Sequence, residues 1–283
     1  MKHRSLFLIL TALVVVMSSC AAYADGAKLG MLSLAKVTAE DFSKAVPDNK
    51  KLVLWEVNEN KSDALDVFRF YDNFSAMLLA LGAGEIDGLL LTRPVAEYIT
   101  AQNPALKVFS VTGMAVNLGY SFGFMNDEKG KSLCEKFNEA LRLIKQVGRL
   151  DKLHAKYLVN PGAKEPEIVK FASFPDGETI RVAVTGDLPP LDYIRADGKA
   201  AGFNTALLAE IGKHLGCNIE ILQVDSAARV PALTSGRADV VFWFGMWAFT
   251  GSFADREQPD TTSEVITSAP YYTTDLLFKV GKK

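Results

Sequence analysis

The sequence predicts an α/β protein built from two units, each with a mostly parallel sheet. Apolar segments of strand length alternate with segments whose apolar residues recur at helical spacing, which is typical of helices packed on a parallel sheet. A unit of the form A-L-x-x-G-x-x-D followed by apolar residues occurs twice, as ALGAGEIDGLLL (80–91) and ALTSGRADVVFW (232–243). The 283 residues also suit two domains of roughly 100–150 residues once a short leader is set aside.

The composition is that of an ordinary globular protein, and it excludes several partners. The chain is 49% hydrophobic and 23% charged, with 31 Lys and Arg against 33 Asp and Glu. Without a basic excess, we expect no nucleic-acid partner. The histidines His3, His154 and His214 are isolated and no HxxxH or CxxC spacing occurs. We therefore expect no metal and no cofactor.

The N-terminus predicts an export signal over residues 1–24. MKHR is basic, and SLFLILTALVVVM is an apolar run of 13 residues. This run is shorter than the roughly 20 residues that span a bilayer. Ala22-Tyr23-Ala24 fits ordinary cleavage, which we favour over lipoprotein processing at Cys20 because Met17 stands where that pattern prefers Leu. Either route places the mature protein outside the cytoplasmic membrane, in the periplasm.

Two cysteines, Cys134 and Cys217, remain after cleavage at the signal. We expect them to be buried small apolar side chains, and a disulfide between them stays open at this point.

The first unit is expected over residues 27–111. Helix 38–46 begins with a Thr cap, Asn73 precedes the helix that ends at Gly82 or Gly84, and Pro94 suits the first turn of the next helix. The expected strands are 27–35, 51–57, 86–91 and 107–111, and the expected helices are 38–46, 74–84 and 92–102.

The second unit is expected over residues 118–158 and 179–283, joined by a linker over 159–178 that is rich in proline and glycine. A break at Gly148 divides 129–158 into two amphipathic helices. An Asp-Gly turn lies within the long loop 187–204. The expected strands are 118–125, 179–186, 218–224 and 238–244, the further helices are 205–216 and 226–236, and 270–280 is extended.

The repeated unit has a structural explanation of its own. Gly84 and Gly236 can end a helix in the left-handed conformation, and a strand covered on both faces is apolar throughout. We expect Asp87 and Asp239, which precede these strands, to be structural caps.

The second unit resembles the first half of the family 3 extracellular solute-binding proteins, the type II periplasmic receptors of amino-acid ABC transporters. The landmarks occur in order: PPLDY (189–193), DG (197–198), GF (202–203), ALTSGRAD (232–239) and PYY (270–272). LGMLSLAKVTAEDF, ALGAGEIDGLLLTRPVAEYI and the run from SFGFM to Leu158 resemble the second half of these proteins.

The two halves stand in reversed order, so the resemblance implies a two-lobed periplasmic-binding-protein type II fold with a circularly permuted lobe order. Residues 27–111 would form lobe 2, and the later segments lobe 1. We expect only residues near 112–117 to cross between the lobes, and the run 276–280 to pair with the strand near 28–32. If that pairing is made with a second copy, a swapped homodimer results.

The resemblance implies a receptor, not an enzyme. It would capture a small polar metabolite, an amino acid or a related organic acid, between its lobes and deliver it to an ABC transporter permease. In such two-lobed proteins, strand ends and helix N-termini from both lobes face the ligand. The residues expected to contact the ligand are Ser33, Tyr71, Asp72, Thr92, Arg93, Asp187, Leu188, Tyr193, Gly245, Trp247 and Arg256.

Several of these residues keep a second interpretation. Asp187 contacts the ligand or serves as a turn residue, and Arg256 binds a carboxylate or lies on the surface. Relatives hold the α-ammonium group with Asp at the position of Thr92, and Arg93 beside it would repel an ammonium group. This departure weakens the case for an α-amino acid and leaves an anionic metabolite open.

The main alternative is an enzyme on the same scaffold, such as a lyase resembling cyclohexadienyl dehydratase. Asp187 or Glu56 would then be the acid or base. A sensor module is a third interpretation, but the chain shows no transmembrane or kinase segment after the two units. A receptor binds its metabolite without consuming it, which separates the alternatives.

Overall fold

The computed structural model describes most of the chain after the expected leader. The described residues are 28–32, 68–109, 116–159, 161–162, 164–249, 263–274 and 277–283. The signal peptide over 1–24, the helix 38–46 and the strand 51–57 lie outside them. Within the described part, no helix combines the length and apolar character needed to cross a membrane.

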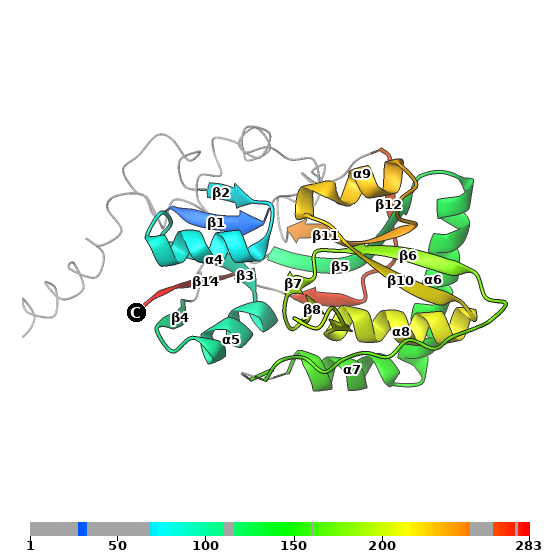
Figure 1. Cartoon of the computed structure of the whole chain (residues 1–283), viewed down its shortest axis with the longest axis horizontal. Coiled ribbons are helices and arrows are strands. Elements are labelled where there is room, and N and C mark those ends of the chain that lie inside the picture. Colours follow the sequence, from blue (N-terminus) through cyan, green and yellow to red (C-terminus); the bar gives the residue numbers. More distant parts are fainter. Residues whose placement is uncertain are drawn as a thin grey trace, which may run out of the picture.

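Two separate sheets confirm the predicted α/β class (Figure 1). The first sheet has the order β2-β1-β3-β14-β4, and its first three strands run parallel. Its strands are β1 (Leu29–Leu32), β2 (Phe68–Tyr71), β3 (Gly88–Thr92), β4 (Leu106–Phe109) and β14 (Leu277–Lys282), and its helices are α4 (Phe74–Ala83) and α5 (Arg93–Gln102). We call this sheet with its helices the first lobe.

The second sheet has the order β10-β6-β11-β5-β12, with β13 also paired to β5. Its strands are β5 (Val116–Met125), β6 (Thr179–Val184), β10 (Asn218–Gln223), β11 (Val240–Phe249), β12 (Val265–Thr267) and β13 (Tyr272–Thr274). The elements around it are α6 (Glu128–Gln146), α7 (Arg149–Tyr157), α8 (Phe203–Leu215), the 3-10 helix η3 (Ser226–Ala228) and α9 (Arg229–Thr234). We call this assembly the second lobe.

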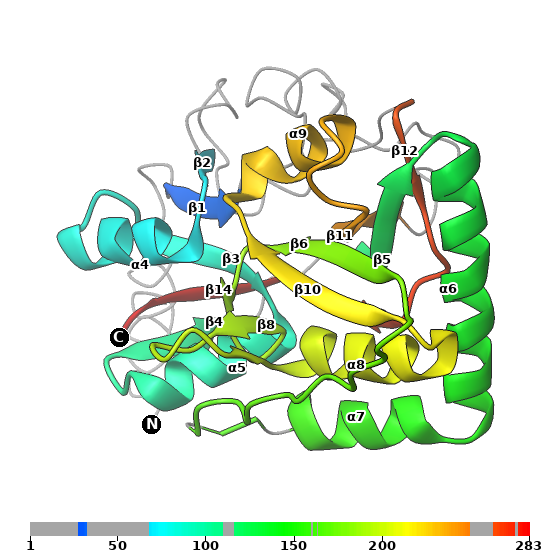
Figure 2. The ribbon, with the colours of Figure 1, turned by 45° about the vertical axis from the view of Figure 1, so that its right-hand side comes forward.

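Helices cover both faces of the second sheet, which explains its apolar strands. Val182 and Val184 of β6 face the main core, whereas Ala183 between them packs with Val230 and Leu233 of α9. On the main-core side, α7 and α8 lie side by side while α6 runs along the end of the lobe (Figure 2). The sheet is therefore buried on both sides, as continuous apolar strands require.

The segment between β6 and α8 is more regular than the loop expected over 187–204. It forms a small antiparallel sheet from β7 (Asp187–Leu188), β8 (Asp192–Ile194) and β9 (Ala200–Ala201). The expected helix 226–236 is divided into η3 and α9, because α9 restarts so that Pro231 falls in its first turn, where no N–H is needed.

The C-terminal strand corrects the expected pairing. β14 lies antiparallel between β3 and β4, and it does not pair with Leu29–Leu32. The chain therefore passes between the two sheets twice, after Phe109 and again after Thr274, so the expectation of a single covalent crossing is wrong. The red strand β14 lies among the blue and cyan strands in Figure 1.

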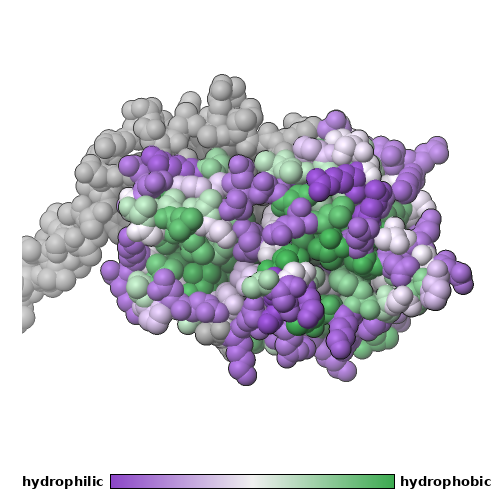
Figure 3. All heavy atoms as spheres, in the orientation of Figure 1, coloured by the Kyte–Doolittle hydropathy of each residue, from purple (hydrophilic) through white to green (hydrophobic). Residues whose placement is uncertain are grey.

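One cluster of buried side chains runs through both lobes. It joins Met77 and Leu89 of the first lobe to Phe122 and Phe203 of the second. The first lobe is also apolar outside this core, since Figure 3 shows hydrophobic surface over α4 and Leu79 of that helix is 74% exposed.

Candidate functional site

The carboxyl ends of parallel strands from the two lobes meet at one junction. β2 and β3 end at the N-termini of α4 and α5, while β6 and β10 end at β7 and η3. The N–H of Ser226 donates a 2.9 Å hydrogen bond to the carbonyl oxygen of Asp72 across this junction. Ligands of α/β proteins bind beside such strand ends. We call this region the lobe junction.

The carboxylate of Asp187 lies on the N-terminus of α4. Its Oδ2 accepts hydrogen bonds from the N–H of Phe74 at 2.7 Å and the N–H of Ser75 at 3.3 Å. The side chain of Asn73 caps the same helix, because its Oδ1 accepts from the N–H of Ala76 at 2.8 Å. Burial raises the pKa of Asp187 above its ordinary value, although the N–H groups of Phe74 and Ser75 oppose that shift.

A second carboxylate, that of Asp192, supports the turn that carries Asp187. Its Oδ2 accepts from the N–H of Gly186 and from the hydroxyl of Thr185, both at 2.9 Å. Asp192 is 4% exposed, and its burial raises its pKa. Gly186 has a φ of 72°, and an added Cβ would meet Ile194 at 2.4 Å, so this turn requires glycine.

Thr92 of the first lobe and Tyr120 of the second lobe lie beside each other. Thr92 ends β3 and is 4% exposed. Burial raises the pKa of Tyr120, on β5 of the other lobe, well above its ordinary value, and the Thr92 hydroxyl opposes that rise. Hydroxyl groups from the two lobes are therefore buried next to each other beside the junction.

Five of the eleven predicted ligand residues lie near strand ends at the junction. Tyr71 ends β2 and Asp72 follows it, Thr92 ends β3, and β7, which follows β6, consists of Asp187 and Leu188.

Tyr193 follows on β8, where burial and the nearby Glu165 carboxylate raise its pKa. The Arg93 side chain is 55% exposed, and its Nη1 lies 3.9 Å from Oε1 of Glu97 on the same helix.

Gly245 sits in β11 where the register with β5 shifts between Phe244 and Met246, a β-bulge that suits a glycine. Ser33, Arg256 and the side chain of Trp247 lie outside the described residues, as does Glu56.

Three residues of the junction were not predicted. Asp192 follows two prolines and a leucine in the sequence, and no periodicity marks it as buried. Ser226 contacts the first lobe through its backbone N–H, a group that every residue except proline has. Tyr120 lies in an apolar strand, where the sequence pattern predicts a core residue.

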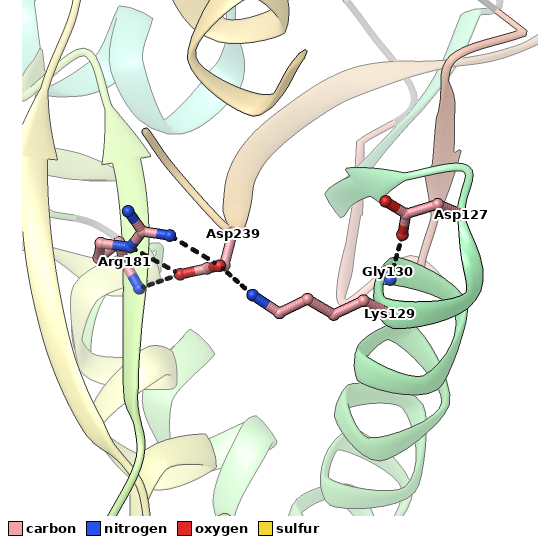
Figure 4. A network of polar contacts seen from close by, with 5 residues as sticks. All are labelled: Asp127, Lys129, Gly130, Arg181 and Asp239. Atoms are coloured by element: carbon pink, nitrogen blue, oxygen red, sulfur yellow. Dashed lines mark hydrogen bonds and ion pairs between the residues drawn. The ribbon is translucent and has the colours of Figure 1, made fainter. Parts of the chain in front are cut away.

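The two acids of the repeated unit are structural, as expected. Asp87 and Lys28 exchange two hydrogen bonds, because the N–H of Asp87 donates to the Lys28 carbonyl and the N–H of Lys28 to the Asp87 carboxylate, both at 2.7 Å. Asp239 and Arg181 form the same reciprocal pair, with lengths of 2.8 and 3.1 Å. Figure 4 shows the Asp239 carboxylate between Arg181 and Lys129, with Asp127 capping α6 beside them.

Two grooves lie on the second lobe away from the junction. One, of about 320 Å³, lies between α7 and α8 and is lined by four lysines, Arg149, Glu167 and Glu210. The other, of about 230 Å³, lies beside Asp239 at the start of α6. Across the part of the chain that the structure describes, no group of three potential metal ligands occurs.

Residues 180–246 match the model of the bacterial extracellular solute-binding proteins, family 3. This stretch runs from β6 through α8 and α9 into β11, and it includes Asp187, Asp192 and Ser226. The resemblance argued from the sequence is therefore confirmed over this part of the second lobe, which is less than a quarter of the 283 residues. A search of the curated proteins found no match.

Solved structures of ABC import components are similar to this chain. A zinc-bound ligand-binding component of an ABC-type import system from Staphylococcus aureus is 12% identical, with a TM-score of 0.42, over 90% of this chain and 65% of that one. The chain thus spans less than two thirds of that protein.

A YaeC-family pheromone precursor and lipoprotein from Enterococcus faecalis is 15% identical, with a TM-score of 0.42, over 91% and 85% of the two chains. A putative L-cystine ABC transporter protein from Listeria monocytogenes is 13% identical, with a TM-score of 0.39, over 91% and 83%.

Proposed function

We propose that this protein is a solute-binding receptor of an ABC import system, acting in the periplasm or at the cell surface. The observation that carries the proposal is the family match over 180–246, which falls on the strand ends that the second lobe presents to the first. The solute would bind at the lobe junction, and contacts from both lobes would favour the closed state that a permease recognises.

The solute class we propose is a small polar metabolite, an amino acid or a related organic acid. Asp187 supplies a carboxylate and Thr92 a hydroxyl group at the junction, and helix α5 begins there. Position 92 is Thr and not Asp, so it offers no carboxylate to bind an α-ammonium group. We therefore favour a solute that does not need an α-ammonium contact at this position.

A thermal-shift screen of the mature protein against amino acids and small organic acids tests the proposal. Binding at about one hundred times the dissociation constant stabilises the folded state by roughly 2.7 kcal/mol, which is readily measured. The compound should be recovered unchanged after incubation. Conversion of many molecules of a hit per protein molecule would support the dehydratase-like alternative, for which Asp187, with its raised pKa, is the candidate acid.

A further inference from the structure

The N-terminus of α4 is already occupied by a group from the other lobe. The first two N–H groups of the helix, from Phe74 and Ser75, donate to the Asp187 carboxylate, and the third, from Ala76, donates to Asn73. The first turn of α4 contains no acidic residue of its own. Asp187 of the second lobe therefore supplies the negative charge that a helix N-terminus favours.

A second contact ties the same segment to the second lobe. The Ser226 N–H donates to the Asp72 carbonyl, two residues before α4 begins, and β7 packs against α4. The segment 72–75 is thus held at both the end of β6 and the end of β10.

We propose that Asp187 acts as an interlobe clasp, which holds the lobes together by capping α4 and prevents anionic groups from binding that helix. The contact between the lobes does not depend on the proposed receptor function. Only its effect on solute binding rests on that function. A carboxylate of the solute reaches the N–H groups of Phe74 and Ser75 only by displacing Asp187. A solute that presents hydrogen-bond donors instead does not compete with the clasp. Asp187 therefore discriminates among the solutes that the lobe junction admits.

The test measures the solute-free protein, so it does not depend on finding a ligand. Asp187→Ala removes the carboxylate, and Asp176→Ala is the control because Asp176 is exposed on the same lobe. We expect the amide hydrogens of Phe74 and Ser75 to exchange about ten to one hundred times faster in Asp187→Ala, because hydrogen bonds to charged groups are the stronger ones. The radius of gyration in solution should also increase, whereas Asp176→Ala should match the wild type.

Acetate then serves as the probe for the emptied position. Added acetate should restore the protection of Phe74 and Ser75 in Asp187→Ala and leave the wild-type protein unchanged. Asp187→Asn retains an acceptor oxygen without the charge, so its exchange rates at Phe74 and Ser75 should lie between those of the wild type and Asp187→Ala. This variant also provides the test if the alanine variant does not fold.

Unchanged exchange and an unchanged radius of gyration in folded Asp187→Ala or Asp187→Asn would overturn the clasp. Failure of every compound in the thermal-shift screen would count against the receptor function and would not affect these results.

Discussion

At the scale of a single residue, the carboxylate of Asp192 is buried, and burial makes its ionised form unfavourable. The side chain is 4% exposed, and burial raises its pKa above the ordinary value of 3.8. A raised carboxyl pKa means that the folded protein binds the proton more tightly than the unfolded chain does. Its ionisation therefore costs stability as the pH rises through the folded pKa, and the cost disappears below 3.8.

The substitution Asp192→Asn should remove this pH dependence. Its side-chain oxygen can still accept from Gly186 and Thr185, so the turn should survive. We expect the unfolding free energy of the wild type, measured against that of Asp192→Asn, to rise as the pH falls from 7 towards 4. Urea unfolding at several pH values measures this difference, and a difference that is constant or falls with acidification would contradict the assignment.

At the scale of elements, the repeated unit shows how far the sequence could be interpreted. The glycine stop, the acid and the apolar strand predicted that Asp87 and Asp239 are structural, and both acids bond to the neighbouring parallel strand. The partners Lys28 and Arg181 could not be predicted, because they depend on which strand lies alongside. The role of Asp192 could not be predicted either, because its burial results from tertiary packing and no local sequence pattern indicates that burial.

Removal of Asp239 should destabilise the second lobe. Its carboxylate accepts from Arg181 Nε, Arg181 N–H and Lys129 Nζ. Burial opposes ionisation, but the hydrogen bonds from Arg181 and Lys129 outweigh it and lower the pKa of Asp239. We expect Asp239→Ala to cost about 1–3 kcal/mol in urea unfolding, since it leaves donors unpaired.

Lys129→Ala is the matched control because its side chain is 78% exposed, and we expect it to cost less than about 1 kcal/mol. Equal costs for the two substitutions would show that the hydrogen bonds from Arg181 to the Asp239 carboxylate contribute little.

At the scale of the whole molecule, β14 returns the C-terminal end of the chain to the first sheet. The sequence predicted the α/β class and two separate sheets but misplaced this strand, because an extended apolar run does not specify its neighbours. The circularly permuted order stays a prediction. The strand lies between β3 and β4 in the first sheet, and Val280 is fully buried there.

Deletion of residues 277–283 should therefore unfold the first lobe selectively. The deletion removes the partner of both β3 and β4, so limited proteolysis should cut within 68–109 while 116–249 resists. Deletion of Lys283 alone is the control and should leave the proteolysis pattern unchanged. Resistance of 68–109 in the longer deletion would mean that the first lobe does not need β14.

Amide hydrogen exchange with and without a solute identified by thermal shift is the most direct test of the receptor account. The account predicts that the solute slows amide exchange at the lobe junction, in residues 72–75, 185–193 and 225–226. The solute should also be recovered chemically unchanged. Slower exchange confined to the groove between α7 and α8, with the junction unchanged, would contradict it.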